Sequence, residues 1–171
     1  MGVAERRTRD RAEREQRIVA AAAAIAERDG WDAVTIRRLA EAIEYSQPVL
    51  YAHFANREAI VAAVAVEGFR ELAAVLRAAA RVASPADGLK RAACAYLDFA
   101  AARPALYEAM FTLQSGLRFA EGDTRPELRE AFEALAASVK PLSPEGRIAT
   151  EVVWGGLHGM ALLEGAGRIP A

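Results

Sequence analysis

The sequence predicts an all-α fold, and three kinds of helix signal in its 171 residues support that prediction. Apolar side chains recur every three or four positions in one stretch after another, which is the spacing of a helix with one buried face. Residues that favour helix starts precede several of these stretches, namely Thr35, Ser46, Pro126 and Ser143. Gly30 and the pair Arg103–Pro104 stand where two stretches end. A chain of this length buries about 70% of its unfolded surface, so it suits one compact chain or two small helical domains.

The first helix is expected over residues 11–29, because Ile18, Ala22 and Ile25 share one face and Gly30 provides a left-handed stop. Arginines crowd the start of this segment, at Arg6, Arg7, Arg9, Arg11, Arg14 and Arg17. Such a cluster is typical of an arm that binds nucleic acid, and equally of a solvated helix with alternating charges and a frayed end. The net charge of −1 and the pI near 6.2 favour neither interpretation.

Residues 35–60 have the spacing of two short helices joined by a tight turn. Thr35 is a natural N-cap for the first helix, whose inner face carries Leu39, Ala40 and Ile43. Ala40 stands where the two helices would cross, so a larger side chain there would push them apart. Tyr45 is expected to fill the turn.

The second short helix is predicted to begin after Ser46, whose hydroxyl is expected to accept the Val49 N–H, with Pro48 in the first turn. Leu50 and Phe54 form its inner face. This helix is too short to be a core element, so its outward side chains are free to enter the major groove of DNA.

Several side chains of this pair are therefore candidates for contacts with DNA. Tyr51 points outward because Leu50 and Phe54 already fill the inner face, which favours a phosphate contact by its hydroxyl. Arg57 stands in the first turn of the next helix, where a cation opposes the helix dipole and needs an anion such as phosphate. The candidate DNA-binding residues are Thr35, Arg37, Ser46, Gln47, Pro48, Val49, Tyr51, His53 and Arg57.

Helical spacing continues in the second half of the chain. A long helix is expected from Asn56 to about Val82, because its apolar residues keep this spacing without a breaker. Residues 84–88 read as a loop, after which a helix runs from Leu89 to the Arg103–Pro104 stop.

Three further segments follow. A short helix is marked by Leu106, Tyr107, Met110 and Phe111. Residues 114–125 are irregular and polar apart from Leu117 and Phe119. Pro126 then opens a helix with an apolar stripe made of Leu128, Phe132, Leu135 and Val139.

The last helix is predicted to start with Ser143 as its cap and Pro144 in its first position. Its glycines cost up to ~1 kcal/mol each relative to Ala, so a close approach of another backbone is the expected compensation. This helix and the one before it are expected to pack against their symmetry mates as a four-helix bundle. The candidate dimer-interface residues are Leu128, Phe132, Leu135, Val152, Gly155, Gly159, Leu162 and Leu163.

Residues 17–64 resemble the DNA-binding domain of the TetR family of bacterial repressors. The resemblance rests on Ile25, Gly30, Trp31, Thr35, Leu39, Ala40, Leu50, Tyr51, Phe54 and the run Asn56-Arg57-Glu58. The string WGGLHGMALLE at residues 154–164 resembles the C-terminal domain of one subgroup of that family. The resemblance implies a homodimeric, ligand-responsive repressor that binds a palindromic operator in double-stranded DNA. It implies a helix-turn-helix DNA-binding domain over residues 1–57 and a ligand-binding and dimerisation domain over residues 58–171.

The turn between the two short helices departs from the family pattern. The family usually has Gly where this chain has Glu44. A non-Gly residue with positive φ is strained, so the turn is expected to be reshaped. A carboxylate near DNA phosphates is also expected to weaken binding.

The family's response to small molecules suggests a ligand cavity in the second half of the chain, although aromatic stripes of this kind are common in plain cores. A cavity with these side chains would prefer a small, mostly hydrophobic effector with one or two polar groups. The candidate lining residues are Phe69, Tyr96, Phe99, Tyr107, Met110, Phe111, Trp154 and His158.

No catalytic site, metal site or cofactor is expected. The chain has two His residues and one cysteine, Cys94, and it lacks a local Ser–His or Cys–His pair and a Gly-rich phosphate loop. Its charged start has no following apolar run, and no stretch reaches the ~20 apolar residues of a membrane span, so a cytoplasmic protein without membrane contact is expected. The alternative function is that of a helical enzyme or hydrophobic-ligand carrier whose N-terminal helices are only structural.

Overall fold

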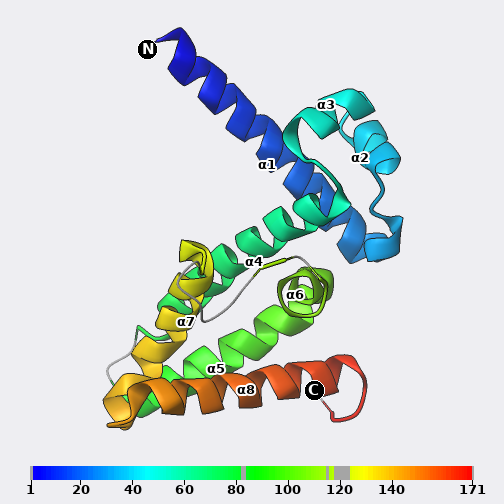
Figure 1. The fold of residues 1–171 in the computed structure, drawn as a ribbon. Coiled ribbons are helices and arrows are strands. Elements are labelled where there is room, and N and C mark those ends of the chain that lie inside the picture. Colours follow the sequence, from blue (N-terminus) through cyan, green and yellow to red (C-terminus); the bar gives the residue numbers. More distant parts are fainter. Residues whose placement is uncertain (1, 82–83, 115, 118–123, 171) are drawn as a thin grey trace. The chain divides into compact units, whose positions relative to one another are not determined.

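The computed structural model describes residues 2–81, 84–114, 116–117 and 124–170. Within these ranges the regular structure consists of eight α-helices and two short 3₁₀ helices, without strands (Figure 1). The predicted all-α fold is therefore confirmed. No helix in this described part of the chain is both long enough and apolar enough to cross a membrane.

The chain divides into two compact units. Unit 1 comprises residues 1–65 and 105–117, and unit 2 comprises residues 66–104 and 118–171. This division differs from the domains predicted over residues 1–57 and 58–171, because unit 1 also holds the start of the long helix and a segment from the middle of the chain. The predicted domain boundary stays a prediction.

Unit 1 opens with a longer helix than expected, because α1 spans Val3–Asp29 instead of residues 11–29. Its first turns are charged and have no apolar stripe, so periodicity could not reveal them. They are held by local polar contacts: the Gly2 N–H donates to Glu5 at 2.8 Å, and an Arg11–Glu15 pair at 2.9 Å follows. Gly30 ends the helix with φ of +79°, as predicted.

Unit 1 holds further elements besides α1. They are η1 (Trp31–Ala33), α2 (Ile36–Ala42), α3 (Gln47–His53) and α6 (Pro104–Phe111), together with the start of α4. Of these, η1, α2 and α3 contact α1. Ile18, Ala22, Leu39 and Leu50 are fully buried and form the centre of this core. The three helices α1, α2 and α3 contact one another, which makes the predicted three-helix unit.

The long helix α4 spans Arg57–Ala79. Asn56 caps it, because the Ala59 N–H donates to the Asn56 side chain at 2.8 Å. The expected end at Val82 lies outside the described residues. This helix contributes residues to both compact units.

Unit 2 contains α5 (Pro85–Ala102), α7 (Pro126–Val139), η2 (Lys140–Leu142) and α8 (Gly146–Gly165), and α5, α7 and α8 contact one another. The loop predicted over residues 84–88 is wrong, because Ser84 is an N-cap that accepts the Asp87 N–H at 3.5 Å. Pro85 occupies the first turn, where it costs no hydrogen bond. The helix and apolar stripe predicted from Pro126 are confirmed.

The predicted start of the last helix at Ser143 and Pro144 is also wrong. The chain first makes the 3₁₀ turn η2, Ser143 is extended, and α8 begins only at Gly146. The connection needs these residues to reverse direction between α7 and α8, and that demand outweighs the capping signal of a Ser-Pro pair. Of the segment predicted to be irregular, residues 114, 116, 117, 124 and 125 lie outside helices, while Phe119 lies outside the described residues.

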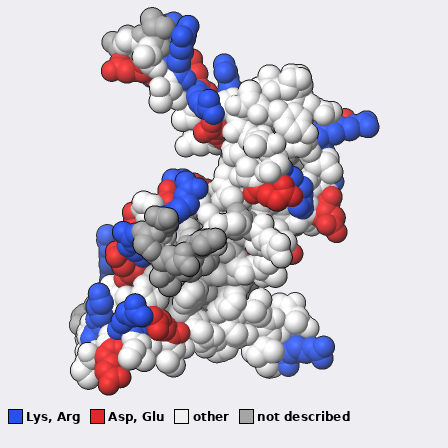
Figure 2. Space-filling model, viewed as in Figure 1, with Lys and Arg blue, Asp and Glu red and all other residues white. Residues whose placement is uncertain are grey.

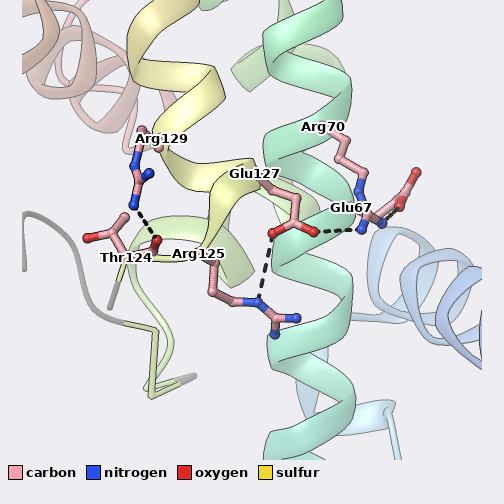
Figure 3. A network of polar contacts seen from close by, with 6 residues as sticks. All are labelled: Glu67, Arg70, Thr124, Arg125, Glu127 and Arg129. Carbon is pink, nitrogen blue, oxygen red and sulfur yellow. Dashed lines mark hydrogen bonds and ion pairs between the residues drawn. The ribbon is translucent and has the colours of Figure 1, made fainter. Parts of the chain in front are cut away.

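Ion pairs join α4 to the start of α7 within unit 2. Arg70 contacts Glu67 at 2.8 Å and Glu127 at 2.7 Å, and Arg125 lies 3.8 Å from the same Glu127 carboxylate (Figure 3). A hydrogen bond from its own backbone, opposed by burial and reinforced by Arg70, lowers the pKa of Glu127. The ionised form is therefore the one that the folded protein prefers.

This lowered pKa predicts how stability depends on pH. Because the folded value lies below the ordinary 4.5, Glu127 stabilises the fold above that pH and loses its contribution as the pH falls through the folded value. Glu127→Gln is expected to lower the free energy of unfolding at pH 7 by about 0.5–1 kcal/mol and to flatten its decline below the ordinary carboxyl pKa. Urea unfolding across pH measures both effects. Parallel pH curves for the two proteins would contradict this role.

Candidate nucleic-acid interface

The α2–turn–α3 pair has the caps and the core that its sequence predicts, with one exception. The Thr35 side chain accepts the Arg38 N–H at 3.2 Å, so Thr35 caps α2. Leu39, Ala40 and Leu50 are buried between the helices. Ser46 does precede α3, but its hydroxyl takes no cap bond, because the Val49 N–H donates to the Ser46 backbone carbonyl at 3.0 Å.

The turn between the helices keeps a left-handed residue at Glu44, whose φ is +57°. The Tyr45 N–H donates to the Ala40 carbonyl at 2.9 Å and the Glu44 N–H to the Glu41 carbonyl at 3.4 Å. These two bonds form the Schellman pattern that normally ends in Gly. The expectation of a reshaped turn is therefore wrong: the packing of Leu39 and Leu50 fixes the turn, and Glu44 accepts the strain.

Replacing Glu44 should separate backbone strain from charge. Glu44→Gly removes a left-handed conformation that costs roughly 1–2 kcal/mol, offset in part by the larger entropy of Gly in the unfolded chain, so stability should rise by about 0.5–1 kcal/mol. Glu44→Asn should give a smaller gain, because Asn tolerates this region, and Glu44→Gln should give none. All three remove the carboxylate and should strengthen DNA binding at low salt. Thermal unfolding measures the stability of the three variants. Equal stabilities of Glu44→Gly and Glu44→Gln would exclude backbone strain at residue 44.

The outward face of α3 is solvent-exposed. Gln47, Pro48 and Ala52 are exposed, Tyr51 keeps 54% of its surface accessible, and Val49 is half-buried. The four exposed side chains lie outside the buried core, which includes Leu50 of the same helix. Their contacts with DNA stay predictions, and their accessibility fits that role.

His53 does not lie on this outward face. It follows Leu50 by three residues, so it shares the inner side of the helix, and its side chain is only 7% exposed. Its Nδ1 lies 3.2 Å from Glu15 on α1. Burial alone would raise the pKa of Glu15, but hydrogen bonds and charges from His53 and Arg11 outweigh it and lower that pKa. His53 therefore positions α3 against α1, and the predicted outward orientation is wrong.

Arg57 also has partners that the sequence did not reveal. Its Nε donates to the Val34 carbonyl at 3.0 Å, and a terminal nitrogen donates to the Trp31 carbonyl at 2.6 Å. The inference that this cation needs an external anion is thus unnecessary, because it already donates to two backbone carbonyls, one in the first residue of η1 and one directly after its last residue. Arg57 therefore holds the segment before α2 against the start of α4.

The remaining polar candidates lie on and before α2. Arg37 is 79% exposed and pairs with Glu41 at 2.9 Å, so its charge is partly balanced within the helix. Thr35 uses its oxygen as an acceptor in the cap, which leaves the hydroxyl hydrogen available to a phosphate oxygen.

One set of polar contacts in unit 1 was not predicted from the sequence. Glu27 on α1 accepts the N–H groups of Ala105 and Leu106, both at 3.1 Å, at the start of α6. Trp31 donates its indole N–H to the Ala105 carbonyl at 2.8 Å. The only signal was that a buried Trp needs a hydrogen-bond partner, and nothing in the sequence indicates which distant residue provides it.

The candidate ligand residues are divided between the two units. Phe69, Tyr96 and Phe99 are buried in unit 2, where Trp154 packs edge-on to Phe132 with ring centres 6.1 Å apart. Burial lowers the pKa of the half-buried His158, so its neutral form prevails at neutral pH. The other three candidates, Tyr107, Met110 and Phe111, belong to unit 1.

The candidate dimer residues fall into two groups. Leu128 and Leu135 are each only 2% exposed, because their stripe on α7 packs into the core of unit 2, so their assignment to a dimer interface is wrong. Phe132 is half-buried. By contrast, Val152, Leu162 and Leu163 on α8 keep 70%, 45% and 46% of their surfaces accessible.

The α8 glycines lie beside these exposed side chains. A Cβ added at Gly155 or Gly159 would meet nothing within 4 Å in the described part of the chain. Helical spacing places both on one stripe with Val152 and Leu163. The close backbone approach expected at these glycines is therefore not made within the described part of this chain.

Two parts of the chain match known protein families. Residues 18–64 match the bacterial regulatory proteins of the tetR family, and residues 89–171 match the tetracyclin repressor-like C-terminal domain. The HTH-type transcriptional regulator Rv0681 of Mycobacterium tuberculosis is 30% identical over 157 residues, which cover 88% of this chain and 69% of that protein.

Solved structures with the same fold extend this agreement. A protein from Rhodococcus sp. RHA1 shares 26% identity with a TM-score of 0.73, over 91% of this chain and 83% of its own. BioQ, solved with its double-stranded DNA operator, shares 21% identity with a TM-score of 0.65, over 90% of this chain and 88% of its own. Taken with the capped α2–turn–α3 pair, these matches show that the chain belongs to the TetR family of transcriptional regulators and carries its helix-turn-helix DNA-binding domain.

Proposed function

We propose that this regulator is a repressor that binds a palindromic operator as a homodimer and releases it when a small, mostly hydrophobic molecule binds to unit 2. The observation that carries the proposal is the exposed face of α3, where Gln47, Pro48 and Tyr51 are accessible above a core that does not need them. BioQ, which shares the fold, was solved with its double-stranded DNA operator, and this supports operator binding by the present chain.

The side chains divide into those that read bases and those that bind the backbone. Gln47 can pair with an adenine edge, and the methyl groups of Val49 suit a thymine methyl. Ser46, Tyr51, Thr35 and Arg37 supply hydroxyl and guanidinium donors for phosphates, which set the register of the protein without specifying sequence.

The homodimer is proposed to form through α8. Its accessible stripe combines Ile148, Val152 and Leu163 with Gly155 and Gly159. Apolar side chains at this exposure are unfavourable in a monomer, and a second copy related by a two-fold axis would cover them with the same stripe. The two α3 helices would then be spaced to read two half-sites about one helical turn of DNA apart.

The effector is proposed to bind among the aromatic residues of unit 2. Phe69, Tyr96, Phe99 and Trp154 provide an apolar environment, and neutral His158 adds a polar group without a charge. Phe69 stands on α4, which continues into unit 1, so a guest that displaces it would act on a helix shared with the DNA-binding unit. The expected coupling is about 1–3 kcal/mol in operator affinity.

Selection of duplexes from a random library by the full chain, followed by gel retardation across a salt series, tests the proposal. The expected result is a palindrome bound with an affinity that falls steeply from ~50 to ~200 mM salt, because phosphate contacts release counterions. Protein that selects no sequence at any salt would refute operator binding.

The effector is tested on the same complex. Hydrophobic compounds that release the operator should also change tryptophan fluorescence, and that change should be lost in Trp154→Phe while the Trp31 signal remains. Release without any change at Trp154 would place the effector elsewhere.

A further inference from the structure

The inner face of α1 changes character along its length. In the second half, Ile18, Ala22 and Ile25 are at most 4% exposed and pack against the other helices of unit 1. Four, seven and eleven residues before Ile18, the same face carries Arg14, Arg11 and Arg7, all exposed. The face that covers the helix-turn-helix therefore continues as an arginine stripe, defined here as Arg7, Arg11 and Arg14.

The stripe lies on a part of α1 that extends past α2 and α3 (Figure 1). Figure 2 shows arginine side chains in blue along this extension, interspersed with acidic side chains in red. The stripe begins beside α3, because Arg11 pairs with Glu15 at 2.9 Å and Glu15 also contacts His53 of α3 at 3.2 Å. Neither Arg7 nor Arg14 forms an ion pair with another residue that the structure describes.

The opposite face of the extension is different. Arg9 pairs with Glu13 at 3.8 Å, and Arg6 lies on the same outer side. Both faces thus carry exposed arginines on one helix, but only the arginine stripe continues the face of α1 that packs against the helix-turn-helix.

We propose that the arginine stripe binds the phosphate backbone of the duplex next to the half-site that α3 reads. Arg7 and Arg14 are separated by seven residues, or about 10 Å along the helix axis at 1.5 Å each. That distance corresponds to about three phosphates of one strand, at a rise of 3.4 Å each along the duplex axis. The inference rests on the proposed operator binding and adds a contact outside the helix-turn-helix. It explains why a helix of 27 residues carries cations on a face that has no core to cover.

The experiment compares R7Q/R14Q with R6Q/R9Q in the full chain. Both pairs remove two charges from the same segment, and Arg and Gln have similar helix propensities, so equal circular dichroism should confirm equal folding. The probe is the duplex selected by the wild-type protein, used once with about one helical turn of flanking DNA on each side and once trimmed to the palindrome.

On the flanked duplex, R7Q/R14Q should make the negative slope of log affinity against log salt shallower. The change should be about 0.9 for each phosphate that is no longer neutralised, so about 4 for a dimer. R6Q/R9Q should change that slope by less than about 1, because its arginines face away. On the trimmed duplex the two double variants should behave alike.

Equal salt slopes for the two double variants on the flanked duplex would overturn the proposed contact between the arginine stripe and DNA. A difference between their slopes that persists on the trimmed duplex would overturn it as well. Either result leaves operator binding by α3 intact. A wild-type protein that selects no duplex would instead refute the proposed function, so the two failures are distinguishable.

Discussion

Arg57→Met is expected to destabilise the free protein by about 2–3 kcal/mol before any DNA is added. The change removes two hydrogen bonds from a charged donor and leaves the Val34 and Trp31 carbonyls without that donor in a half-buried site. Met keeps the length and the apolar contacts of the Arg stem, so the destabilisation reports the guanidinium itself. Because α2 is then less firmly held, DNA affinity should fall for all sequences alike.

The controls separate this role from a phosphate contact. Arg57→Lys keeps the charge but replaces a planar fork by a single point donor, so it should recover only part of the stability. Arg37→Met removes an arginine that is 79% exposed and should cost less than about 0.5 kcal/mol. Urea unfolding without DNA is the decisive measurement. If Arg57→Met unfolds like the wild type and loses only DNA affinity, the phosphate interpretation is right.

The sequence predicted the fold wherever a local signal agreed with the apolar spacing. The Thr35 cap defines the start of α2, Pro126 that of α7, and Gly30 the end of α1, because each acts through its own backbone conformation or the nearest N–H groups. The beginnings of α5 and α8 show the limit. Both follow a Ser-Pro pair, yet only Ser84 caps a helix, while Ser143 is drawn into the connection between α7 and α8.

The site was less predictable than the fold, because a helical stripe shows which face is covered and not what covers it. Leu128 and Leu135 were expected to face a second copy and instead face their own core. His53 and Arg57 are polar side chains near a DNA-binding helix, and both contact residues of their own chain that lie more than twenty positions away. Only the folded chain shows that their role is to position α3 and α2.

Gly159→Leu is expected to convert the proposed dimer into a monomer while leaving each chain folded. A Cβ added at residue 159 meets nothing within 4 Å in the described part of its own chain, and Leu favours a helix over Gly by about 1 kcal/mol, so the protomer should become slightly more stable. In a two-fold interface through the α8 stripe, the bulky side chain enters twice. Each insertion into a packed surface costs about 1–3 kcal/mol, so two insertions should lower dimer affinity by about 30-fold or more.

Gly165→Leu is the matched control, because it makes the same change on the same helix, also in open space, but about 120° around the helix axis from Gly159. It should sediment like the wild type. Gly159→Leu should sediment as a monomer and lose operator affinity by a further large factor, since a single α3 can then engage only one half-site and the gain from linked binding disappears. Circular dichroism and thermal unfolding of Gly159→Leu should match the wild type, which would show that the side chain leaves the protomer's own core intact. A Gly159→Leu protein that keeps the dimer mass would therefore show that the two copies meet on a different face.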